Sequence, residues 1–406
     1  MGAKKSKNPR LPPLRPEESV AIDNLMNFND HVHVDNLLSK WQPLLTENMA
    51  QHVRLWFLSN QSDRSEIEHI YQSFALNAMY QENYHGLVKK IFSNSSVLQY
   101  SIDLTESLMI CLKSTDQYKH WVQVNAKSRA IPQLGLEFSN ESISSSIDTW
   151  LQKETYYGLM HRILITTLYG VPENNNLFPA IGIDEKYNKS FKTILDFGWI
   201  MFIVKHLPSD CQNSWRLLYS SSSHGESFQA LIAAIIDQGC TIVVVKDTDG
   251  NIFGGYASQS WIMKPSFYGD SGCFLFTLLP NFNCCVASGR NDNFMYMNNG
   301  QYTFPNGLGM GGQMGYWGLW LDSEYGKGQC NVSCSTFADF SMPTKEKDFV
   351  ISSLEVWCVK EKINDESDEK KRKKPTNTDY MDMKLLEMAG RPKYTDNLKS
   401  DENHPY

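Results

Sequence analysis

Long apolar runs and an excess of positive charge are both missing from this 406-residue sequence. Its longest apolar stretch, around Phe197 to Val204, is far shorter than the roughly 18 residues that a membrane-spanning helix needs. Lysine and arginine number 38 against 45 aspartate and glutamate residues, which gives a net charge of −7. Because nucleic-acid phosphates attract basic surfaces, we expect no nucleic-acid partner. The first twenty residues lack the apolar core of a secretory signal, so we expect a cytosolic-side protein whose nine cysteines are reduced.

Metal-binding motifs are also missing. Cys330 and Cys334 have no second cysteine pair at zinc spacing. The segment Asp247-Thr248-Asp249-Gly250 resembles half a calcium loop, but Tyr256 stands where the loop would need a carboxylate. The same Asp-Gly pair is typical of a β-hairpin turn. We therefore predict a hairpin there, and no metal or other cofactor.

The N-terminal arm, residues 1–16, carries a possible lipidation motif. Met1-Gly2 with Ser6 fits the N-myristoylation pattern, in which the acyl chain is attached to Gly2. A single myristoyl chain binds membranes weakly, with K on the order of 10⁴ M⁻¹, so a second signal is needed. Basic residues supply it by attraction to an anionic leaflet: Lys4, Lys5, Lys7, Arg10 and Arg15. We predict a disordered, reversible membrane anchor.

Two folded regions follow the arm. Residues 17–209 repeat apolar residues every three or four positions, which predicts an all-helical domain with an EF-hand-like pairing of helices but no calcium loop. Residues 210–360 instead show short strands punctuated by glycine. Ser227 is expected to cap a helix over 228–238 within this second domain. The expected strands are 215–220, 241–246, 252–256, 274–279, 319–321 and 354–360. The fold class is therefore α+β.

The C-terminal part has opposite charge blocks and a short apolar stripe. Residues 361–377 form a charged linker in which the basic block Lys370–Lys374 could act as a nuclear signal, a membrane contact or a solvated spacer. Residues 378–390 are predicted to be an amphipathic helix, and 391–406 a disordered tail. A helix this short is marginal alone, so it packs on its own domain or, as the linker favours, docks on a partner. The expected partner-binding residues are Tyr380, Met381, Leu385, Leu386 and Met388.

Two patterns suggest chemistry and have simpler structural interpretations. His224 and Ser227 stand close together, yet Gln229 occupies the place of the second glycine in a nucleophile elbow, and Ser227 is explained as a helix cap. Gly307 to Gly312 matches Gly-x-Gly-x-x-Gly, but a strand-like segment follows where a dinucleotide site needs a helix. We predict close backbone packing or a structured loop at these glycines and no catalytic residues, with His224 and Ser227 as the remaining candidates.

A series of motifs in the second domain resembles the TLDc domain. The series is Trp215-Arg216-Leu217-Leu218-Tyr219-Ser220, His224-Gly225-x-Ser227-Phe228, Phe253-Gly254-Gly255-Tyr256-Ala257-Ser258 with Trp261, Phe274-Leu275-Phe276, Pro305 to Gly312, Gly318-Leu319-Trp320 and Leu354-Glu355-Val356-Trp357. Within this family the chain is most similar to the N-myristoylated, lysosomal, mTOR-associated type. That similarity lies in the Met-Gly start, the helical first half and the stretch Asn306 to Gln313.

The resemblance implies a β-sandwich-type domain and a set of partners. TLDc proteins bind the vacuolar proton-pumping ATPase through this domain and act in the oxidative stress response. The mTOR-associated type sits on lysosomes and supports mTOR signalling. In that type the helix after the TLDc domain contacts the ATPase, which corresponds here to Tyr380–Ala389. We therefore expect a non-enzymatic adaptor on the cytoplasmic side of membranes, mainly lysosomal and partly cytosolic.

Two alternatives remain from the sequence. The protein could be an oxidative-stress protective domain with weak or unknown catalytic activity centred on His224, Ser227 or a cysteine. It could also be a nuclear cofactor that uses the basic block Lys370–Lys374.

Overall fold

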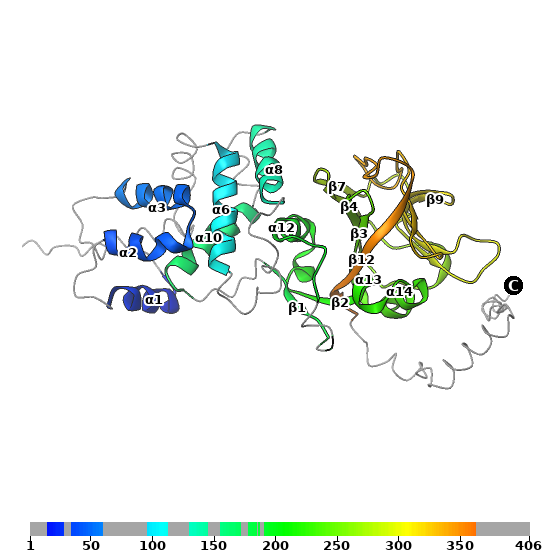
Figure 1. Ribbon diagram of the computed structural model, residues 1–406, viewed down its shortest axis with the longest axis horizontal. Coiled ribbons are helices and arrows are strands. Elements are labelled where there is room, and N and C mark those ends of the chain that lie inside the picture. Colours follow the sequence, from blue (N-terminus) through cyan, green and yellow to red (C-terminus); the bar gives the residue numbers. More distant parts are fainter. Residues whose placement is uncertain are drawn as a thin grey trace, which may run out of the picture. The chain divides into compact units, whose positions relative to one another are not determined.

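A computed structural model describes residues 14–27, 34–59, 96–112, 130–144, 155–171, 178–184, 186 and 191–362. The chain divides into two compact units (Figure 1). The first, here called the helical unit, runs to Leu217 and includes Phe276–Asn283. The second, the β unit, comprises Leu218–Leu275 and the chain from Cys284 onward.

The helical unit is organised around α6 (Val97–Leu112), which packs against α3, α8 and α10. Tyr100, Leu104 and Leu108 of α6 follow the four-residue spacing of one helix face and are fully buried. The prediction of N-terminal helices is confirmed. The other helices are α1 (Pro16–Asn27), α2 (Val34–Trp41), α3 (Glu47–Ser59), α8 (Ala130–Ser144), α10 (Thr155–Leu168) and α12 (Phe197–His206), with 3-10 turns η1 (Gln42–Leu44) and η2 (Ser209–Cys211).

Polar side chains of α6 hold the start of α3. Thr46 precedes α3, and its hydroxyl accepts a hydrogen bond from Met49 N–H as a helix cap. The backbone N–H of Thr46 in turn donates to Ser107 Oγ at 3.1 Å. The carboxylate of Asp103, which is 3% exposed, accepts from Asn48 Nδ2 at 3.3 Å. This carboxylate therefore lies where the N-terminal dipole of α3 is positive.

The β unit is built on a sheet whose strands run in the order β5-β8-β9-β10-β11-β12-β3-β4-β6-β7. Strand β2 also pairs with β12, and with β1 in parallel. The bounds are β1 (Ala180–Gly182), β2 (Ser214–Ser220), β3 (Gly239–Asp247), β4 (Ile252–Ala257), β5 (Lys264–Tyr268), β6 (Phe274–Leu279), β7 (Asn283–Val286), β8 (Met295–Asn298), β9 (Gly307–Gln313), β10 (Tyr316–Asp322), β11 (Lys327–Gln329) and β12 (Asp348–Glu361).

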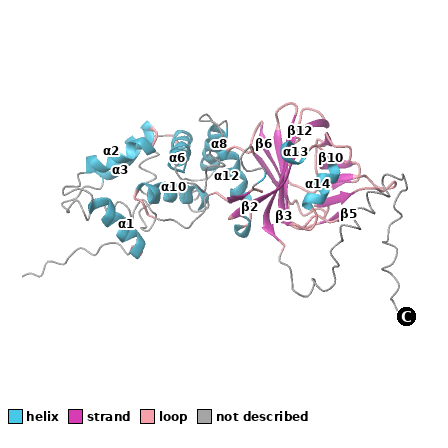
Figure 2. Ribbon diagram, turned by 60° about the horizontal axis from the view of Figure 1, so that its bottom comes forward, coloured by secondary structure: helices cyan, strands magenta, loops and turns pink. Residues whose placement is uncertain are grey.

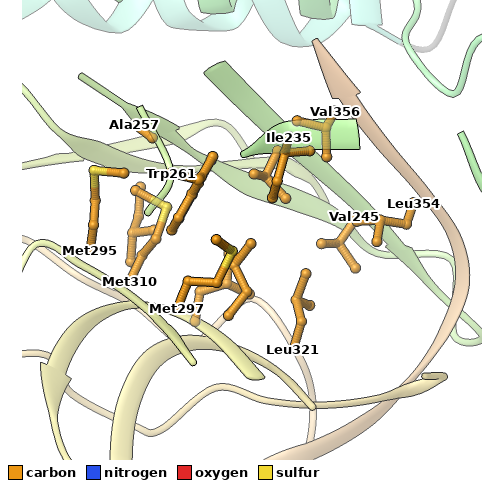
Figure 3. Close-up of a cluster of buried hydrophobic side chains, with 14 of the residues drawn as sticks. Ile235, Val245, Ala257, Trp261, Met295, Met297, Met310, Leu321, Leu354 and Val356 are labelled. Atoms are coloured by element: carbon orange, nitrogen blue, oxygen red, sulfur yellow. The ribbon is translucent and has the colours of Figure 1, made fainter. Parts of the chain in front are cut away.

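The sheet curls on itself (Figure 2), and residues of β8, β9 and β10 share one apolar core with residues of β3, β4 and β12. Met295, Met297 and Met310 point into this core from one side (Figure 3). Val245 and Val356 point into it from the other, and Trp261 lies between Met310 and Ile235. The alternation of inward and outward residues is that of a sandwich, so the predicted β-sandwich type is confirmed in the form of a curled antiparallel sheet.

Two local predictions differ from the structure, and one short helix was not predicted. The helix that Ser227 begins, α14 (Phe228–Ile235), ends earlier than expected because Asp237 adopts a left-handed conformation with φ of 63° and its N–H bonds to Trp261 O. A short helix α13 (Ser221–His224) precedes it. Strand β1 lies inside the region that was expected to be wholly helical, and its three residues give the sequence too short a pattern to detect.

Candidate functional site

His224 and Ser227 stand at the turn between β2 and α14, and each is engaged with nearby backbone. Ser220 N–H donates to His224 Nδ1 at 3.0 Å. The imidazole stacks on the ring of Tyr219 at 5.9 Å, and Tyr219 OH donates to the carbonyl of Gly225 at 2.6 Å. Ser227 Oγ accepts from Ala230 N–H at 3.3 Å, which confirms the predicted N-cap of α14.

These bonds define what the two side chains can do. A general base for a serine nucleophile needs a ring nitrogen with its lone pair aimed at the hydroxyl. In His224 the Nδ1 lone pair is directed at a backbone N–H, while the Ser227 hydroxyl oxygen accepts from the first turn of a helix. The arrangement is that of a rigid turn between a strand and a helix. Both side chains therefore have a structural role in this connection.

Burial keeps five of the cysteines in the protonated thiol form. Burial raises the pKa of Cys111 to about 12 and that of Cys285 to about 11. Burial also raises the pKa of Cys273, Cys330 and Cys334. Because the thiolate is the nucleophilic form, these thiols stay protonated at neutral pH and behave as small core residues.

The glycine-rich segment is strand β9, where glycines make room for aromatic rings. A Cβ added to Gly309 would lie 2.8 Å from Trp317 and 3.0 Å from Trp320. Those two indoles stack at 4.4 Å, and Tyr296 lies 5.2 Å from Trp317. Close backbone packing is therefore the correct interpretation of this motif, and the glycines cradle protein rings where a dinucleotide site would hold phosphates.

The Asp-Gly motif forms the predicted turn between β3 and β4. Asp247, which is 3% exposed, accepts from Asn251 N–H at 2.8 Å and from Asn251 Nδ2 at 2.7 Å. Its carboxylate therefore closes the hairpin.

A cavity of about 510 Å³ opens beside this turn. Its charged lining residues are Asp247, Asp249, Asp322, Lys327, Lys345, Glu346 and Asp348. Within the described residues, no group of three histidine, cysteine or acidic side chains is placed to hold a metal ion.

Most of the residues expected to contact membranes and partners lie outside the described residues. This holds for the lipidation site Gly2, for the basic side chains Lys4, Lys5, Lys7 and Arg10, and for the tail residues Tyr380, Met381, Leu385, Leu386 and Met388. None of the helices that the structure describes is long and apolar enough to cross a bilayer.

Arg15 is the one member of the basic arm that the structure places. Its guanidinium pairs with the fully buried carboxylate of Glu18 at 2.7 Å. Glu18 also accepts from Arg15 N–H at 2.8 Å, and Pro16 occupies the first helical position. This is one half of a capping box, so Arg15 is the residue that caps the N-terminus of α1. Sequence reasoning missed this role, although Pro16 followed two positions later by Glu18 is its signal.

Comparison with known proteins agrees with the arrangement of the β unit. Residues 188–360 match the model of the TLDc domain. The chain is also 35% identical over 334 residues to "MTOR-associated protein MEAK7" from Gallus gallus, an alignment that covers 75% of this chain and 70% of the relative. The chain belongs to the MEAK7 family of TLDc-domain proteins.

Other MEAK7 proteins match over a shorter length. The relative from Xenopus laevis is 39% identical over 266 residues, or 63% of this chain and 57% of the relative. The relative from Danio rerio is 40% identical over 213 residues, or 52% of this chain and 47% of the relative. The chain thus spans about half to 70% of the length of these MEAK7 proteins, and the TLDc motif series that predicted the family is confirmed.

Proposed function

We propose that this protein is a non-enzymatic, membrane-anchored adaptor that acts in mTOR signalling. The observation that carries the proposal is the similarity to relatives named for their association with mTOR, which extends beyond the TLDc domain to 75% of the chain. The local roles of His224 and Ser227 and the buried thiols favour an adaptor over the oxidative-stress enzyme that was the alternative.

Two further steps concern location and partner. A myristoyl chain on Gly2, with Lys4, Lys5, Lys7 and Arg10, would hold the protein to the cytoplasmic face of the lysosome. The β unit and the stripe of Tyr380, Met381, Leu385 and Met388 would bind the vacuolar proton-pumping ATPase. The support for both steps is the sequence pattern and the TLDc resemblance.

The test is affinity purification of the full chain from a lysosomal fraction, read by mass spectrometry. Three variants are compared with the wild type: Gly2→Ala, Met388→Asp and Met383→Asp. Met383 is the matched control for Met388. It has the same side chain, but in the predicted helix it lies opposite the stripe that contains Met381 and Met388. We expect Gly2→Ala to release the protein into the cytosol, and Met388→Asp to lower recovery of proton-pump subunits about tenfold or more while Met383→Asp recovers them fully. Full recovery with Met388→Asp would refute the tail contact, and unchanged membrane retention of Gly2→Ala would refute the anchor.

A further inference from the structure

The helical unit contains an apolar groove at the start of α1. Its volume is about 670 Å³, within the roughly 300–1,000 Å³ typical of small-molecule sites. One side of the groove is a face of α1, and the other is formed by Lys40 at the end of α2 and by Tyr169 and Gly170 after α10. The α1 residues that line it are Pro16, Glu17, Val20, Ala21, Asn24 and Leu25.

Helix α1 has two faces with different roles. Glu18 and Ile22, four residues apart, are both fully buried and face the interior of the unit. Val20, Ala21 and Leu25 form a second apolar stripe, and it faces the groove. Val20 is 58% exposed, so this stripe presents an apolar side chain to the solvent. A soluble helix with such a second stripe is suited to cover an apolar ligand.

The position of the groove along the chain indicates the ligand. The groove begins at Pro16, the residue that directly follows Arg15, whose ion pair with Glu18 fixes where the N-terminal arm joins the helical unit. From Pro16 to Leu25 the groove follows α1 for about 14 Å at 1.5 Å per residue. That length accommodates most of an extended myristoyl chain. The arm from Gly2 to Pro16 spans at most about 50 Å when extended, which is ample for it to fold back.

We propose that this groove holds the myristoyl chain of Gly2 when the protein is off the membrane. The proposal rests on the acylation of Gly2 in the proposed function, and it adds a second state to it. In one state the acyl chain lies along Val20, Ala21 and Leu25; in the other it is inserted in the bilayer.

A reversible device requires that neither state be overwhelmingly favoured over the other. Because the acyl chain is attached to the same polypeptide, its effective concentration near the groove is on the order of 1 mM. A membrane association constant on the order of 10⁴ M⁻¹ is weak enough for such a tethered site to compete. Because the two states exclude each other, weakening the groove shifts the population toward the membrane.

The experiment uses the full chain co-expressed with an N-myristoyltransferase, with acylation verified by intact mass. The groove variant is Val20→Asn with Leu25→Asn. The matched control is Leu55→Asn with Leu136→Asn, which changes two aliphatic residues that are 53% and 49% exposed elsewhere on the helical unit. Each is also made with Gly2→Ala. Binding to vesicles of phosphatidylcholine and phosphatidylserine is measured by sedimentation, and the thermal unfolding midpoint is measured without vesicles.

We expect the acylated groove variant to bind vesicles about three- to tenfold more than the acylated wild type and the acylated control, while the three Gly2→Ala forms bind equally. Acylation should raise the unfolding midpoint of the wild type and the control but not that of the groove variant, because a bound ligand stabilises only the protein that holds it. Equal vesicle binding by acylated wild type and groove variant, or an equal midpoint shift in both, would overturn the groove and leave the anchor intact. A wild-type chain that the transferase leaves unacylated would overturn the anchor and the groove together.

Discussion

In strand β9 of the β unit, glycine stands where a side chain would collide with an aromatic ring, whereas helix α6 of the helical unit buries small polar side chains. Strand β9 passes beneath Trp317 and Trp320 because Gly309 leaves space for the indoles. Helix α6 buries Ser101 and Thr105 by donating their hydroxyls to backbone carbonyls four residues earlier, each at 2.7 Å. Strand β9 therefore depends on a residue without a side chain, whereas α6 at Ser101 and Thr105 depends on hydrogen bonds that several residue types can make.

This difference decides what a substitution does in each unit. A glycine that borders a ring or a carbonyl cannot accept a Cβ without displacing the neighbouring strand. A capping or back-bonding side chain can be exchanged for another acceptor at modest cost. Pairs of substitutions can therefore test this difference, because the expected losses of stability differ in size.

The largest effect is expected at Gly312 on strand β9. This residue has a φ of 91°, and an added Cβ would overlap the carbonyl oxygen of Tyr316. Its N–H also donates to Thr336 Oγ1 at 2.8 Å, so the backbone cannot move away freely. We expect Gly312→Ala to lower the free energy of unfolding of the β unit by more than about 3 kcal/mol, measured by urea denaturation.

Gly315 in the same hairpin is the control. It has a φ of 76°, but an added Cβ there would meet no atom within 4 Å. Gly315→Ala should therefore cost only the backbone strain, about 1–2 kcal/mol. Equal losses for Gly312→Ala and Gly315→Ala would show that left-handed strain, and not the close approach of β10, makes glycine necessary in this unit.

The same contrast explains how much of the fold the sequence could predict. The TLDc motifs were recognisable because Gly309, Gly312 and Trp320 each make a close contact in the fold, so their spacing is characteristic of it. In the helical unit the apolar repeat predicted the helices. The pairing of Asp103 with the start of α3, 55 residues away along the chain, leaves no local pattern. The groove of α1 was unpredictable for the same reason, since Tyr169 reaches it only through the fold.

The next effect concerns Ser227, where the helix cap and a catalytic nucleophile predict different results. Ser227→Ala should lower the free energy of unfolding by about 1 kcal/mol, because Ala230 N–H loses its acceptor. Ser227→Asp should restore most of that loss, since aspartate is an equally good cap, and pump binding should follow stability in both variants. Peroxide protection in cells expressing each variant is the second measurement. Loss of protection with a stable, pump-binding Ser227→Asp protein would favour the enzyme, because an aspartate caps the helix but cannot replace a serine nucleophile.

The smallest effect is a pH dependence confined to the helical unit. His52 of α3 is 9% exposed and packs edge-on against Tyr100 at 5.2 Å, and burial lowers its pKa even though Asp103 acts in the opposite direction. Below the ordinary histidine pKa of about 6.5 the unfolded chain therefore binds a proton that the folded chain resists, so the contribution of His52 to stability is complete above pH 6.5 and declines as the pH falls. Urea denaturation followed by far-UV circular dichroism from pH 7.5 to about 5 should show a shallower decline for His52→Gln than for the wild type. Identical pH slopes in the two proteins would mean that α3 tolerates the charged imidazole, and that its contact with α6 is looser than the burial of Tyr100 and Asp103 indicates.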